Sequence, residues 1–72
     1  MTEAPLIVTI QDAREAGLCS PGQRAWFRRH GLDFRRFLDQ GIDAQTLIAL
    51  DDAMADRAVR QAIARLQAEG AD

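Results

Sequence analysis

Three joints, each made of a glycine, an apolar residue and a helix-capping residue, divide this chain into short segments. They are Gly17-Leu18 followed by Ser20, Gly31-Leu32-Asp33 and Gly41-Ile42-Asp43. Glycine can take the positive φ that ends a helix, the apolar residue packs back over that end, and a Ser or Asp side chain caps the next helix. The pattern predicts a series of short helices separated by tight stops.

Further start signals and the apolar spacing give the bounds of each helix. Thr9 with Asp12 has the spacing of a capping box, and Asp51 or Asp52 begins the last helix. Ser20-Pro21-Gly22-Gln23 supplies a capping serine, a proline in the first turn and a glutamine that can reach back. We predict an all-α fold, a compact bundle of about five short helices with orthogonal packing and no sheet, at residues 10–16, 21–30, 34–40, 44–49 and 53–69.

Aromatic residues and apolar stripes define the expected core. Trp26 and Phe27 point about 100° apart on a helix, so we expect one of them to enter the core and the other to lie at its edge. The later helices carry inward stripes at i, i+3 and i+4 spacing. The stripe residues are Phe34, Phe37 and Leu38, then Ala44, Leu47 and Ile48, then Ala55, Ala58, Val59, Ala62, Ile63 and Leu66.

Length and composition indicate one small domain. The chain has 72 residues, of which 47% are apolar and 28% charged, as is usual for a globular protein. Leu6-Ile7-Val8 is rich in β-branched residues, but no second strand candidate accompanies it. We therefore expect residues 1–8 to be a loose or extended segment, and residues 9–72 to form a single helical domain.

Several function classes are disfavoured by the same facts. A substrate pocket of roughly 300 to 1,000 Å3 would consume most of so small an interior. Cys19 and His30 are the only soft metal ligands in the sequence, and structural zinc needs four ligands. A Cys-His nucleophile would also need a positioned base and an oxyanion site. We predict no enzymatic activity, no cofactor, no metal site and no small-molecule substrate.

The expected compartment is the cytoplasm. One cysteine cannot form an internal disulfide, which favours a reducing environment. No stretch has the apolar length of a membrane span, and the N-terminus lacks the pattern of a signal peptide. We expect no membrane partner.

Charge is segregated along the chain, although the net charge is only −2. Five arginines face one aspartate between residues 24 and 36, whereas residues 39–56 carry five aspartates and no basic residue. Trp and Arg dominate binding hot spots. Our first hypothesis is a protein-interaction module that contacts its partner through Trp26, Arg28, Arg29, Arg35 and Arg36. A second copy is a special case, because the basic region of one chain could meet the acidic region of another.

The alternative hypothesis is DNA binding. The expected helices 10–16 and 21–30, with the turn between them, have the order and size of a helix-turn-helix. The stretch V-T-I-Q-D-A-R-E-A-G-L-C-S-P-G-Q-R-A-W-F, within residues 8–30, resembles the start of excisionase-type regulators. That resemblance implies that the second helix would contact DNA, through Gln23, Arg24, Arg28 and Arg29.

A wider part of the chain, from Val8 to Val59, resembles another family. The segments C-S-P-G-Q-R-A-W-F-R-R-H-G-L-D-F and G-I-D-A-Q-T-L-I-A-L-D-D-A resemble small uncharacterised proteins encoded in tailed phages and prophages of proteobacteria. The resemblance implies a bacterial cytoplasm during phage gene expression, and a partner that is phage-encoded. It supplies no catalytic residue.

Overall fold

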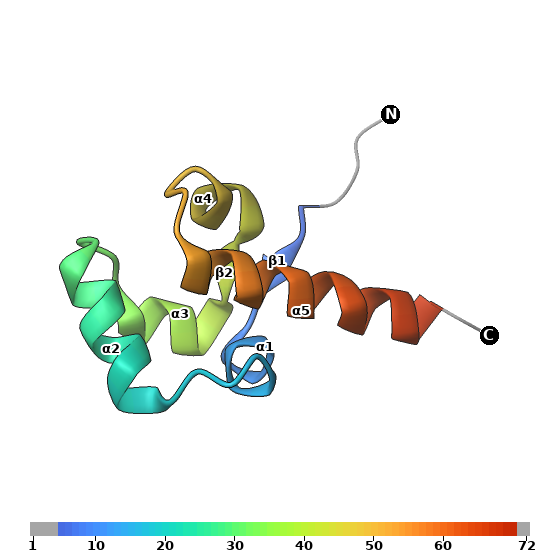
Figure 1. Cartoon of the computed structure of the whole chain (residues 1–72), viewed down its shortest axis with the longest axis horizontal. Coiled ribbons are helices and arrows are strands. Elements are labelled where there is room, and N and C mark those ends of the chain that lie inside the picture. Colours follow the sequence, from blue (N-terminus) through green and yellow to red (C-terminus); the bar gives the residue numbers. More distant parts are fainter. Residues whose placement is uncertain (1–4, 71–72) are drawn as a thin grey trace.

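The computed structural model describes residues 5–70 and shows a mostly helical domain (Figure 1). In chain order the elements are β1 (Ile7–Val8), α1 (Ile10–Glu15), α2 (Ser20–Arg29), α3 (Phe34–Gln40), β2 (Ile42–Asp43), α4 (Ala44–Ile48) and α5 (Ala53–Gly70). Helices α1 and α4 pack against α5, while α2 and α3 form a pair at one end of the domain. The C-terminal half of α5 projects beyond the other elements (Figure 1). The five predicted helices are confirmed.

The prediction of no sheet is wrong, because β1 and β2 form a small antiparallel sheet. Ile7 pairs with Asp43 and Val8 with Ile42, and the Ala44 amide donates a 2.9 Å hydrogen bond to the Leu6 carbonyl. Residues 6–8 are therefore tied to the domain, while the predictions for residues 1–4 and 71–72 lie outside the described residues. Strands of two residues are too short to show a sequence pattern, so nothing local identified β2.

All three glycine joints end a helix as predicted, and Gly41 is the C-terminal cap of α3. Gly17 and Gly31 take φ of 89° and 68°. The following leucine amides reach back to the helix, Leu18 to Ala13 at 3.0 Å and Leu32 to Phe27 at 2.8 Å. At Gly41 the backbone instead has φ 75° and ψ −170°, so the chain leaves α3 extended and enters β2. This third joint starts a strand because its ψ differs from that of a helical stop.

The predicted helix caps are confirmed at four helices and wrong at α2. Thr9 and Asp12 form a reciprocal capping box, and Asp33, Asp43 and Asp52 accept backbone amides at the starts of α3, α4 and α5. Ser20 is already the first residue of α2, and its cap position, Cys19, makes no side-chain capping bond.

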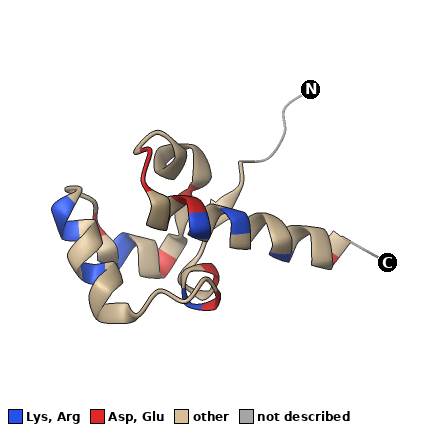
Figure 2. Cartoon of the chain, viewed as in Figure 1, with Lys and Arg blue, Asp and Glu red and all other residues tan. Residues whose placement is uncertain are grey.

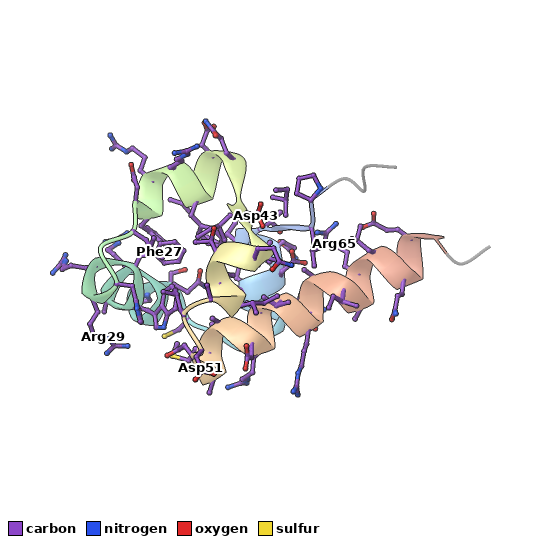
Figure 3. The ribbon with its side chains drawn as sticks, turned by 90° about the horizontal axis from the view of Figure 1, so that it is seen from above. Phe27, Arg29, Asp43, Asp51 and Arg65 are labelled. Carbon is purple, nitrogen blue, oxygen red and sulfur yellow. The ribbon has the colours of Figure 1, made fainter. Side chains whose placement is uncertain are left out.

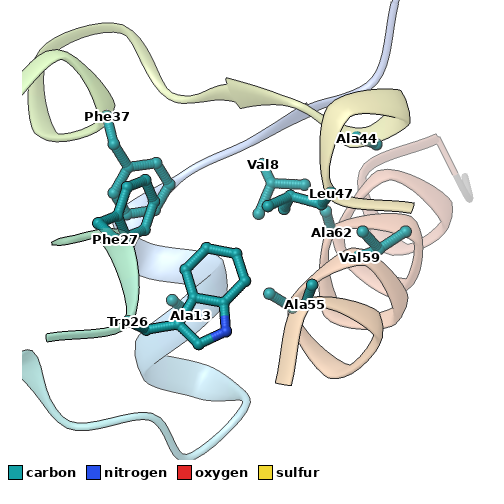
Figure 4. Close-up of a cluster of buried hydrophobic side chains, with 11 residues drawn as sticks. Val8, Ala13, Trp26, Phe27, Phe37, Ala44, Leu47, Ala55, Val59 and Ala62 are labelled. Atoms are coloured by element: carbon teal, nitrogen blue, oxygen red, sulfur yellow. The ribbon is translucent and has the colours of Figure 1, made fainter. Parts of the chain in front are cut away.

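The core joins the aromatic residues of α2 and α3 to small residues of α5 (Figure 4). The Phe27 ring lies 4.7 Å from the Phe37 ring and 5.4 Å from the Phe34 ring. Val8 and Leu47 lie between this cluster and α5, where Ala62 is fully buried (Figure 4). Both Trp26 and Phe27 are buried, at 4% and 5% exposure, so the expectation that one would lie at the edge is wrong.

Four residues predicted as core lie on the surface instead. Leu38, Ile48, Ile63 and Leu66 are each between 42% and 47% exposed. In each case the helical spacing is correct, but no other element within residues 5–70 covers that part of the helix. The apolar stripe of α5, for example, continues past Ala62 into the projecting half of the helix (Figure 1).

Candidate protein-interaction surface

The five arginines of α2 and α3 are exposed and make no ion pair with any carboxylate within residues 5–70. The two ion pairs in this part of the chain both belong to Arg65 of α5. Figure 2 shows basic residues on α2 and α3 and further basic residues along α5, with acidic residues at the turn between α4 and α5. Unpaired guanidinium groups remain available for an external anionic partner.

Three of these arginines lie on α2 and α3 near two apolar side chains of α3. The Arg24 guanidinium lies 5.8 Å from the centroid of the half-buried Phe34 ring. Leu38 follows Phe34 by one helical turn and is 47% exposed. Arg28 follows Arg24 by one turn on α2, and Arg35 precedes Leu38 by three residues on α3. We call these five residues, Arg24, Arg28, Phe34, Arg35 and Leu38, the α2–α3 surface.

Arg29 and Arg36 lie outside the α2–α3 surface. Arg29 is one residue past Arg28, so it points about 100° away around α2. Figure 3 shows Arg29 on the side of the domain that carries Asp51. Arg36 lines a groove of about 290 Å3 between α3 and α4, whose apolar walls are Leu32, Phe37 and Ile42. The structure therefore separates Arg29 from the other arginines, whereas Arg35 and Arg36 line one hollow together with Leu38.

Trp26 cannot serve as the aromatic contact that was predicted. Its side chain is buried, and its indole nitrogen donates a 3.0 Å hydrogen bond to the Asp52 carboxylate. The Trp26 ring also stacks on His30, with 4.3 Å between the ring centroids. The polar atom of the indole is satisfied inside the domain, so the exposed or half-buried apolar side chains near these arginines are Phe34 and Leu38.

Gln23 is likewise unavailable to DNA. It is 3% exposed, and its side-chain nitrogen donates a 2.9 Å hydrogen bond to the Leu18 carbonyl. The Gln23 oxygen is buried without a partner among residues 5–70. Helix α1 packs chiefly on α5, whereas the two helices of a helix-turn-helix act as one packed unit. Of the predicted DNA contacts, Arg24, Arg28 and Arg29 remain exposed.

Asp51 and Asp52 have different roles in the turn before α5. The Asp52 carboxylate accepts the amides of Met54 and Ala55 in addition to the Trp26 indole. The hydrogen bond from Ala55, with those from Trp26 and Met54 and the nearby charge of His30, outweighs partial burial and lowers the pKa of Asp52 below 3.8. Asp51 is exposed and has a positive φ of 51°. The sequence did not distinguish between Asp51 and Asp52 as the residue that caps α5, and the structure shows that the cap is Asp52.

The described residues were compared with the requirements of a metal site, a cavity and a membrane span. Residues 5–70 hold no group of three or more His, Cys, Asp or Glu side chains that could bind a metal. An interior cavity of about 30 Å3 is lined by Gln23 and apolar residues such as Trp26 and Leu47, and this volume is about that of one water molecule. No described helix is both long and apolar enough to cross a bilayer.

Comparison with known proteins adds no assignment. No family model, no curated protein and no solved structure matches the chain. The resemblances to phage-encoded proteins and to excisionase-type regulators therefore stay predictions.

Proposed function

We propose that this chain is a non-enzymatic protein-interaction module whose α2–α3 surface binds an acidic partner. The observation that carries the proposal is that Arg24 lies over the half-buried Phe34, with Arg28 on the same face of α2, and that Arg35 lies beside the exposed Leu38. None of these three arginines has a carboxylate partner in residues 5–70. Guanidinium groups bind carboxylates in bidentate geometry, and an apolar centre with a charged rim is the usual anatomy of a protein interface. The partner should present an apolar side chain flanked by carboxylates.

A nucleic-acid partner is less well supported. Phosphate binding needs positive charge, and an exposed leucine adds nothing to it. The molecule carries a net charge of −2, and Gln23, the one neutral polar residue proposed to read bases, is buried. We further propose, from the sequence resemblance alone, that the setting is the cytoplasm of a phage-carrying bacterium.

The proposal can be tested by NMR titration of the isotope-labelled protein with two probes. One probe is a synthetic helical peptide with leucines flanked by glutamates, and the other is a mixed-sequence DNA duplex. We expect the peptide to shift the amide signals of residues 24, 28 and 34–38, with an affinity that falls as salt screens the charges. We expect the duplex to cause no saturable shifts at moderate salt.

Matched variants locate the contact. Arg24→Gln with Arg28→Gln should weaken peptide binding about tenfold, since two charge-assisted hydrogen bonds are lost. Arg14→Gln with Arg60→Gln removes the same charge from exposed positions of α1 and α5 and should leave binding unchanged. The proposal fails if the peptide shifts no signals of α2 or α3, or if only the duplex binds and does so with a steep salt dependence.

A further inference from the structure

We infer that a second copy of this chain is a partner of the α2–α3 surface, and that it docks there through Ile48 and Asp51, which we call the acidic turn. This inference rests on the proposed function and identifies the partner. The acidic turn lies where α4 ends and before α5 begins. It carries the features that the α2–α3 surface requires of a partner, a carboxylate beside an exposed apolar side chain.

Asp51 has no structural role for its carboxylate within the described residues. Its side chain is exposed and makes no hydrogen bond or ion pair in residues 5–70, whereas the Asp52 carboxylate accepts three hydrogen bonds. The φ of 51° at Asp51 lies in the left-handed region, where glycine is the least strained residue. Aspartate tolerates this region better than most residues, but its carboxylate makes no hydrogen bond or ion pair within residues 5–70. A backbone held at positive φ, together with a carboxylate that has no partner within residues 5–70, points to an external contact.

Ile48 lies in the same turn as Asp51. The Asp51 amide donates a 3.1 Å hydrogen bond to the Ile48 carbonyl, and the Ile48 side chain is 46% exposed. The acidic turn therefore offers an apolar group and a carboxylate a few residues apart. The α2–α3 surface offers the opposite set, Leu38 and Phe34 with three guanidinium groups.

The two surfaces cannot meet within one molecule. Figure 3 shows Asp51 on one side of the domain and α3 on the opposite side, and Figure 1 agrees with that separation. A contact between them must join two copies, and it is heterologous because different surfaces meet. An assembly built in this way keeps an unused α2–α3 surface at one end and an unused acidic turn at the other. We therefore expect copies to add head to tail. The patches are small and charged, which makes the contact weak and sensitive to salt.

The test measures molecular mass by sedimentation equilibrium of the full chain up to about 1 mM protein, a concentration suited to weak contacts. We expect the apparent mass to rise with protein concentration at about 20 mM salt, and to fall toward the monomer at about 300 mM salt. Variant one carries Arg24→Glu and Arg28→Glu, which reverses part of the α2–α3 surface. Variant two carries Ile48→Ser and Asp51→Asn, which removes the acidic turn.

Each variant alone should be monomeric, because it retains only one competent surface. An equal mixture should form a dimer and nothing larger, because the acidic turn of variant one can bind the intact α2–α3 surface of variant two. Ile63→Ser with Arg60→Glu, at exposed α5 positions, is the control and should associate as the unmodified chain does. A circular dichroism melt of each variant confirms that loss of association is not loss of folding.

Three outcomes overturn the inference. They are a monomeric unmodified chain under all conditions, normal association of either variant, and a mixture that stays monomeric although the unmodified chain associates. All three leave the proposed function standing if the acidic peptide still shifts the signals of α2 and α3, so the two failures are distinguishable. A separate readout is Asp51→Gly, which should raise the thermal midpoint by relieving positive φ while reducing self-association about tenfold.

Discussion

The indole nitrogen of Trp26 donates a 3.0 Å hydrogen bond to the Asp52 carboxylate, which also caps α5 through the amides of Met54 and Ala55. One carboxylate therefore fixes the only tryptophan and begins the longest helix. This bond joins residues 26 positions apart, and it turns the Trp26 side chain inward. The surface left for a partner then consists of arginines and the neighbouring residues of α3.

Removing the Asp52 carboxylate should destabilise the fold. We expect Asp52→Ala to lower the free energy of unfolding by about 2 to 3 kcal/mol, because α5 loses its cap and the buried indole loses its acceptor. Asp52→Asn keeps an acceptor oxygen and should cost about 1 kcal/mol. Urea unfolding followed by tryptophan fluorescence measures both. Asp56→Ala on the exposed side of α5 is the control, and a loss there as large as in Asp52→Ala would contradict the assignment.

The ion pair between Arg65 and Asp12 should show strong energetic coupling. The Arg65 Nε atom lies 2.8 Å from Asp12 Oδ1, and the Asp12 side chain is fully buried. Arg65 also donates to the Ile7 carbonyl at 3.2 Å, so one side chain ties α5 to α1 and β1. We expect Asp12→Ala to cost about 3 kcal/mol, and a double-mutant cycle with Arg65→Ala to give a coupling above about 1 kcal/mol.

The other ion pair of Arg65 serves as an internal control. Its partner Glu69 is 61% exposed and lies 3.4 Å away. Solvent screening limits such a pair, so Glu69→Ala should change stability by about 0.5 kcal/mol or less. Equal coupling energies in the two ion pairs would contradict the prediction that burial of Asp12 makes its pair with Arg65 the stronger one.

Stability should fall in acid because of Asp12 and Asp52. Burial raises the pKa of Asp12, but hydrogen bonds from Arg65 and Thr9 and the charge of Arg65 outweigh it and hold the pKa below 3.8. The pKa of Asp52 is also lowered from 3.8. As pH falls, the two carboxylates therefore take up protons at a higher pH in the unfolded chain than in the folded one. Their contribution to the free energy of unfolding is complete above the unfolded pKa of 3.8, and it is lost as pH falls through the lower folded pKa values.

The measurement is urea unfolding at a series of pH values from neutral to strongly acidic. Asp12→Asn and Asp52→Asn remove the two titrating groups, so each should make the acid decline shallower, and both together should remove most of it. Asp39→Asn changes an exposed carboxyl outside both networks and should leave the slope unchanged. If the free energy of unfolding of the double variant falls in acid as steeply as that of the unmodified protein, other groups cause the acid sensitivity.

Gly41 and Gly31 should differ sharply when replaced by alanine. Both have positive φ, but a Cβ at Gly41 would lie 2.6 Å from Ile7 Cγ2 and 2.8 Å from the Val8 carbonyl oxygen. Apart from its chain neighbours, no residue in the range 5–70 has an atom within 4 Å of a Cβ at Gly31. We expect Gly31→Ala to cost about 1 kcal/mol from φ strain alone, and Gly41→Ala about 3 kcal/mol or more because β1 must also shift. Similar thermal midpoints for the two variants would contradict the close approach of β1 to Gly41.

Local chemistry in the sequence determined the helices and most of their ends. The Thr9 and Asp12 box, the aspartate caps and the positive φ at Gly17 and Gly31 each depend on residues within about five positions, so short stretches predict them. The aromatic core was predictable for the same reason, since helical spacing brings Phe34 and Phe37 to one face.

Tertiary structure alone decided the sheet, the buried ion pair and the exposure of Leu38. Ile7 and Asp43 pair across 36 positions, and Arg65 reaches Asp12 across 53. Helical spacing assigns Leu38 to the same stripe as Phe37, yet Leu38 is 47% exposed and Phe37 only 4%, because no other element within residues 5–70 covers that part of α3. Spacing fixes which side chains share a helix face, whereas burial depends on whether a distant segment packs there. The arginines were visible in the sequence, but their placement near Phe34 and Leu38 required the packing of α2 on α3.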